Sequence, residues 1–60
     1  MNTELELRAG DKWENKQYNY KVKILTVIEG FIMARRKKDH PFVEEIRIFI
    51  KMYRPETITN

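Results

Sequence analysis

Alternating apolar and polar residues mark the longest predicted strand, over residues 18–28. Aromatic and β-branched side chains occupy every second position from Tyr18 to Ile24, with polar residues between them, which is typical of a strand with one wet face. From Ile24 to Ile28 both faces are apolar apart from one threonine. This predicts a strand that enters the interior or bends at a bulge, as strands of a small barrel do.

A second strand is predicted over residues 31–36, after a tight turn at Glu29-Gly30. Helix is disfavoured across residues 18–36, because this stretch is rich in β-branched and aromatic residues and has a central glycine. The chain then becomes densely basic through Arg35-Arg36-Lys37-Lys38, breaks at Asp39-His40-Pro41 and turns apolar again. Such a pattern predicts two antiparallel strands joined by a positively charged loop.

Residues 41–54 fit two structures. As a helix, they carry a regular apolar stripe, with Pro41 at the first position and Pro55 as a stop. As a strand, isoleucines alternate with polar residues but Phe49 lies on the wet face. Local signals alone leave both open.

The ends of the chain carry weaker patterns. Leu5 and Leu7 alternate with charged residues, which predicts a leading strand or a loose arm. Gly10-Asp11 is a turn signal. Residues 57–59, which follow Pro55, predict a short last strand.

The composition indicates a single small folded domain over residues 1–60. Apolar residues make up 42% of the chain, cysteine is absent and His40 is the one histidine. Disulfides are therefore excluded, and a structural zinc is not expected. A domain of this size buries little surface, so association with a second copy is one expected remedy.

No apolar run approaches the roughly 20 residues needed to span a bilayer. The start of the chain is acidic and lacks the basic and apolar regions of a signal peptide. We therefore expect a cytoplasmic protein without a membrane partner.

Five short stretches form a combined pattern: Gly10-Asp11-Lys12-Trp13, Tyr20-Lys21-Val22, Gly30-Phe31-Ile32-Met33-Ala34-Arg35-Arg36-Lys37, Pro41-Phe42-Val43 and Phe49 with Tyr53-Arg54-Pro55. Together they resemble a class of phage and prophage reading frames that have the look of SH3-like small β-barrels. The resemblance implies a strand over residues 41–46 paired with residues 31–36, a short helical turn near residues 48–53, and a final strand. The class mostly lacks assigned function, so no chemistry follows.

The expected fold is therefore mainly β: a single SH3-like small barrel of about five antiparallel strands with one short helical turn. The alternative is a three-stranded sheet covered by a helix over residues 41–54.

Catalytic equipment is not apparent, and we expect neither enzymatic activity nor a cofactor. Serine and cysteine nucleophiles are absent. Asp39 and His40 are adjacent without a third group to orient them. Glu44 and Glu45 would point to opposite faces of a strand, and no glycine-rich phosphate loop is present.

Binding is the expected role, and the basic residues are its main candidates. Residues 8–38 carry nine Lys and Arg against three acids, a block that suits nucleic acid, an acidic protein surface or simple solubility. Trp13 and Tyr20 are candidate stacking faces, although Trp13, Phe31, Phe42 and Phe49 also suit the core. The candidate binding residues are Lys21, Lys23, Arg35, Arg36, Lys37, Lys38, Trp13 and Tyr20.

An apolar surplus points to a protein partner instead. Five apolar residues exceed what one face of a small barrel buries, which is a feature of interfaces, although a well-filled core would absorb them too. They are Leu25, Val27, Ile32, Ile48 and Met52. We expect a phage-type protein that docks on a host protein, such as a defence or nucleic-acid-processing factor, and modulates or inhibits it. The alternative is direct nucleic-acid binding through the basic hairpin.

Overall fold

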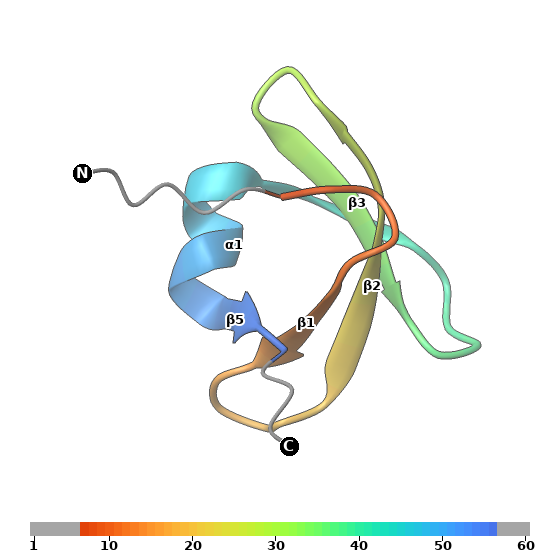
Figure 1. The fold of residues 1–60 in the computed structure, drawn as a ribbon, viewed down its shortest axis with the longest axis vertical. Helices are drawn as coiled ribbons and strands as arrows, with labels where there is room; N and C mark the ends of the chain where they lie inside the picture. The colour runs from red at the N-terminus through yellow and green to blue at the C-terminus, as the bar shows by residue number, and fades with distance from the viewer. Residues whose placement is uncertain (1–6, 57–60) are drawn as a thin grey trace.

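The computed structural model describes residues 7–56, which form five antiparallel strands in one sheet and one short helix (Figure 1). The mainly β prediction is therefore confirmed. The elements are β1 (Lys12–Asn15), β2 (Lys21–Ile28), β3 (Phe31–Arg36), β4 (Phe42–Glu45), α1 (Ile46–Met52) and β5 (Tyr53–Pro55).

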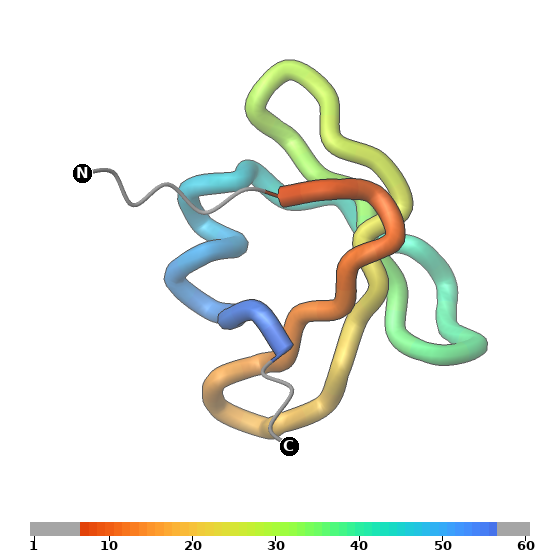
Figure 2. Tube along the Cα trace, in the orientation of Figure 1, coloured from red at the N-terminus to blue at the C-terminus, as the bar shows by residue number. Residues whose placement is uncertain are grey.

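The strands follow the order β4-β3-β2-β1-β5, so β4 and β5 are the two edges of an open sheet. The sheet is curved, and α1 with β5 lies across from β2 and β3 (Figures 1 and 2). No pairing joins β4 to β5 within residues 7–56. Closure into an SH3-like barrel therefore stays a prediction.

The β2–β3 hairpin turns where the sequence predicted. Ile28 pairs with Phe31 across the two-residue turn Glu29-Gly30, and both turn residues have positive φ, 49° and 83°. This is the geometry of a type I′ turn, whose twist matches the flanking strands. The register shifts between Ile24 and Thr26, which agrees with the bulge that was one of the two structures predicted for this stretch.

The turn between β1 and β2 is organised by a buried asparagine. The Asn15 Oδ1 atom accepts hydrogen bonds from the backbone N–H groups of Gln17 (2.9 Å) and Tyr18 (2.8 Å), and Asn19 takes a positive φ of 65°. Asparagine side chains commonly stabilise turns in this way. The prediction that the strand begins at Tyr18 is wrong, because this turn delays the strand to Lys21.

Residues 41–54 divide between strand and helix, and the alternative of one helix across this range is wrong. Phe42–Glu45 pairs with β3, which holds these residues extended. Helix α1 follows directly, and Phe49 is its buried residue. Within residues 7–56 no helix has the length and apolar character to cross a membrane.

Edge strand β5 contains a proline that the sequence suggested only as a helix stop. Glu14 pairs with Arg54 and Trp13 with Pro55, while the N–H of Glu56 donates to Lys12 O. Antiparallel pairs alternate in hydrogen bonding, so Pro55 occupies a position where no N–H is needed. The strand predicted at residues 57–59 and the Leu5 pattern lie outside the described residues.

The core lies between the inner face of the sheet and α1. Trp13 is 2% exposed and its ring centroid lies 5.3 Å from that of Phe49, whose own ring stacks on Tyr53 at 4.5 Å. The prediction that Phe31 belongs to the core is wrong, because Ile32 and Ala34 take the inner face of β3 and leave Phe31 44% exposed. The buried apolar residues are Trp13, Val22, Ile24, Ile32, Ala34, Phe49 and Tyr53.

Candidate functional site

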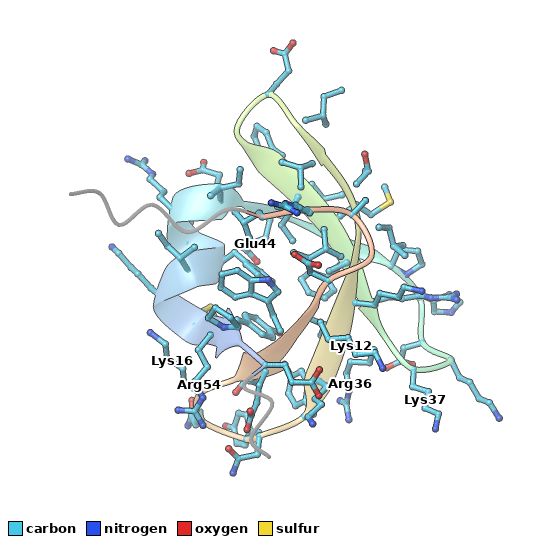
Figure 3. The ribbon with its side chains drawn as sticks, viewed as in Figure 1. Lys12, Lys16, Arg36, Lys37, Glu44 and Arg54 are labelled. Atoms are coloured by element: carbon cyan, nitrogen blue, oxygen red, sulfur yellow. The ribbon has the colours of Figure 1, made fainter. Side chains whose placement is uncertain are left out.

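Seven basic side chains border one open hollow beside β1, β2 and β3, which we call the basic surface. Two strands and the loop after β3 supply the six basic residues that the sequence predicted, and β1 adds Lys12. Lys12, Arg36 and Lys37 lie in the same region of Figure 3. The residues are Lys12, Lys21, Lys23, Arg35, Arg36, Lys37 and Lys38.

Three of these cations form a row across adjacent strands, here called the cation row. Lys23 is opposite Lys12 on β1 and opposite Arg35 on β3, and all three are exposed. Sequence reasoning missed Lys12, because the pairing of β1 with β2 is what brings it beside Lys23.

The two lysines of the cation row face each other at close range. The N–H of Asn15 donates to Tyr20 O and that of Ile24 donates to Asp11 O, so alternation makes Lys12–Lys23 a non-hydrogen-bonded pair. Cβ atoms in such pairs are about 4.5–5.5 Å apart, and like charges there are destabilising. Repulsion between Lys12 and Lys23 is therefore expected to lower the free energy of unfolding slightly.

A second row of charged residues crosses β5, β1 and β2, two residues away from the cation row along β1 and β2. We call it the paired row. Glu14 is opposite Arg54 on β5 and opposite Lys21 on β2, so the signs alternate. The Arg54 Nη2 atom lies 3.4 Å from Glu14 Oε2. Opposite charges in this arrangement are favourable.

Glu56 is the acid that adjoins both rows, and Lys21 engages it. The Lys21 Nζ atom lies 2.7 Å from Glu56 Oε2. This hydrogen bond raises the pKa of Lys21 and lowers the pKa of Glu56. The positive charge of Lys12 also lowers the pKa of Glu56, so this carboxylate makes its ion pair with Lys21 but lies close to the β1 end of the cation row as well.

Tyr20 links the basic surface to the core. The Arg36 guanidinium carbon lies 4.1 Å from the Tyr20 ring centroid, a cation–π contact. The Tyr20 hydroxyl is 2.9 Å from that of Tyr53 and accepts a hydrogen bond from Asn15 Nδ2 at 3.3 Å. Burial, followed by the hydrogen bond with Tyr20, raises the pKa of Tyr53 to about 12. Tyr20 is thus held by contacts on several sides.

The prediction of Trp13 as a stacking face is wrong. Its ring is enclosed between the sheet and α1, so no base can reach it. The structure presents Tyr18 instead, with 68% of its surface exposed and its ring nearly parallel to that of Tyr20. The sequence signal that could have indicated the exposure of Tyr18 is the stretch from Asn15 to Asn19, since asparagines at both ends favour a turn that exposes the residues between them.

Glu44 and Glu45 do not come together as a two-carboxylate site. Glu44 pairs with Ile32 and Glu45 with Phe31, so the two carboxylates extend from opposite faces of β4. Glu45 accepts a hydrogen bond from Arg47 Nε at 3.1 Å. Within residues 7–56 no three His, Cys, Asp or Glu side chains gather as a metal site would require.

Apolar side chains occupy the other end of the outer face of β2, β3 and β4, here called the apolar strip. Ile28 is opposite Phe31, and Met33 is opposite Val43. Ile28 is 61% exposed and Val43 58%. The prediction that five apolar residues exceed the core is correct for only some of them. Ile32 is buried in the core and Leu25 is half-buried. The exposed ones are Val27, Ile48 and Met52.

Comparison of the chain with protein-family models, with curated proteins and with solved structures gave no match.

Proposed function

We propose that this protein binds nucleic acid through the basic surface and does not act on it as an enzyme. The observation that carries the proposal is the cation row, where Lys12, Lys23 and Arg35 lie side by side across three strands. Such an arrangement lowers stability slightly. A polyanionic ligand that neutralises these charges would remove the repulsion between them, and binding such a ligand would explain why the three cations lie together.

The chemistry of the basic surface suits phosphate backbones. Seven cations border one hollow, and each phosphate that is neutralised releases condensed counterions. Binding of this kind depends steeply on salt and only weakly on sequence. Lys37 and Lys38, in the loop after β3, extend the surface beyond the sheet.

The test is a fluorescence titration with labelled single- and double-stranded DNA and RNA at about 50 and 200 mM salt, where phosphate contacts change affinity most visibly. We expect tight binding at low salt, a steep loss at high salt, and weaker binding for Arg35→Gln. Arg47→Gln is the matched control, because it removes one exposed arginine charge from α1, away from the basic surface. Absence of binding at low salt, or equal losses in both variants, would overturn the proposal.

Docking on a host protein is the second candidate, favoured by the apolar strip. The resemblance to phage and prophage reading frames suggests a partner in the host cell's cytosol, and we propose a defence or nucleic-acid-processing factor. Met33 on β3 is two residues from Arg35 on the same face, so the apolar strip continues into the cation row. The partner that fits this face presents an apolar patch with an acidic rim.

This candidate is tested by capture from a bacterial lysate, followed by titration of the purified captured protein. Phe31→Asp, in the apolar strip, is compared with Met52→Asp, an exposed apolar residue on α1. Loss of affinity with Phe31→Asp alone supports docking through the apolar strip. Equal affinity in both variants contradicts it. Light scattering of the free protein tests whether association with a second copy, one of the remedies expected for so small a domain, takes place.

A further inference from the structure

Tyr18 is an exposed aromatic residue whose backbone is anchored in a turn and whose ring lies beside that of Tyr20. It lies in the turn between β1 and β2 and exposes 68% of its surface. Its backbone N–H donates to Asn15 Oδ1 at 2.8 Å, and its ring lies within 8° of parallel to Tyr20 with the centroids 6.5 Å apart. A preorganised exposed ring of this kind loses little freedom when a flat ligand stacks on it.

The residues behind Tyr18 are anchored as well. Tyr20 is contacted by the Arg36 guanidinium at 4.1 Å, and its hydroxyl is hydrogen-bonded to the buried Tyr53 at 2.9 Å. Tyr18, Tyr20 and Arg36 thus form a continuous set of contacts from the turn to the basic surface. The aromatic pair is part of the same surface as the cations.

Cations lie on both sides of the aromatic pair. On one side, Tyr20 lines a hollow whose other residues are four cations and one acid, so its net charge is positive: Lys21, Arg36, Lys37, Lys38 and Asp39. With Tyr18, it also lines a second hollow that includes Lys16 and Lys51. A chain that crosses from one hollow to the other passes over the aromatic pair and meets positive charge before and after it.

We infer, on the basis of the nucleic-acid binding proposed above, that the ligand is single-stranded: one base stacks on Tyr18, and phosphates on either side are neutralised at the two hollows. A single strand offers the face of an unpaired base, whereas a duplex keeps its base faces stacked inside the helix. Alternation of aromatic rings with cations is the usual means of binding single strands without reading their sequence.

The test compares a labelled oligothymidine of about 12 nucleotides, within the site sizes of small single-strand-binding domains, with a duplex of the same length. Tyr18→Ala is expected to weaken oligothymidine binding about 5- to 150-fold, the loss of one stacked base, without changing the salt slope. Lys37→Gln is expected to reduce the slope by about 0.7, as one lost phosphate contact does on a single strand. Tyr18→Phe should keep wild-type affinity.

Phe31→Ala is the matched control, since it removes another exposed aromatic ring at the far end of the hairpin. Thermal unfolding verifies that each variant is folded. If the wild type binds oligothymidine but Tyr18→Ala binds it equally well, or if the duplex binds as tightly, the single-strand inference is wrong and the proposed function stands. If neither nucleic acid binds, the proposed function fails.

Discussion

The paired row and the cation row cross the same face of the sheet two residues apart, yet their charges follow opposite patterns. In the paired row, Arg54, Glu14 and Lys21 alternate in sign across β5, β1 and β2. In the cation row, Lys12, Lys23 and Arg35 have one sign across β1, β2 and β3. Backbone pairing is similar in the two rows, so the difference lies in the side chains alone.

The difference between the two charge patterns matters little for the stability of the fold. Cross-strand pairs change stability by roughly 0.2–1 kcal/mol, and exposed ion pairs contribute about as little. Neither row can hold the domain together, so the like-charged row is not required by the fold. The proposed nucleic-acid ligand would account for its arrangement, whereas opposite charges in the paired row favour the edge next to β5.

The largest expected effect concerns neither row but the residue between them. Trp13 lies between Lys12 and Glu14 in β1 and faces inward. Trp13→Ala should cost about 3–5 kcal/mol, which is comparable with the whole stability of so small a domain, and leave the chain largely unfolded. Circular dichroism with thermal melting measures this. A cooperative transition near that of the wild type would mean that the outer rows hold more of the stability than we assign.

Removal of the cation row gives the next largest effect. The triple variant Lys12→Gln, Lys23→Gln, Arg35→Gln should reduce the log–log salt slope for single-stranded nucleic acid by about 2, with a matching loss of affinity at low salt. The double variant Glu14→Gln, Arg54→Gln keeps net charge unchanged and serves as the control. Similar slopes for all three proteins would show that the two rows do not differ in function.

The dependence of stability on alkaline pH tests Tyr53, the buried residue of β5 next to Arg54 of the paired row. Burial raises the pKa of Tyr53 from 10.0 to about 12, so the folded state holds its proton where the unfolded chain has lost it. The stabilisation is complete below pH 10 and is lost as the pH rises through 12. Tyr53→Phe lacks this titration. Urea unfolding at several pH values should therefore show a shallower alkaline decline in the variant, and parallel declines would contradict this.

The smallest expected effect is the sharpest test of the comparison. Lys23→Glu gives the cation row alternating signs, so it should raise the free energy of unfolding by about 0.2–1 kcal/mol while it weakens nucleic-acid binding. Urea denaturation and the fluorescence titration measure the two changes. Glu14→Lys is the converse, and should lower stability without loss of binding. Gains in both properties for Lys23→Glu would show that the row has no ligand.

The β2–β3 hairpin could be predicted from sequence because its signals are local. Glu29-Gly30 favours a type I′ turn, and the two-faced apolar stretch from Ile24 indicated the bulge that the register shift confirms. The boundary between β4 and α1 could not be predicted in this way, because local sequence signals do not specify it. Residues 41–54 carry a regular helical stripe, and only pairing of Phe42–Glu45 with β3 excludes helix there.

The candidate site was predicted only in part for the same reason. The run Arg35 to Lys38 is contiguous, so its charge density is visible in the sequence. Whether Trp13 or Tyr18 displays its ring depends on which side of β1 faces α1 and on the turn that Asn15 holds. Aromatic residues satisfy the requirements of a core and of a stacking surface equally well, so the pattern could not separate the two.

The sequence by itself determined a small, mainly β domain without disulfides, with a tight turn at Glu29-Gly30 and a basic segment after β3. These features follow from period, turn chemistry and charge, which act over a few residues. Only the tertiary structure decided that Lys12 joins Lys23 and Arg35 in one row, that Trp13 is enclosed and that Tyr18 is displayed. Strand register and the packing of α1 bring together residues far apart in the chain, and no local pattern specifies them.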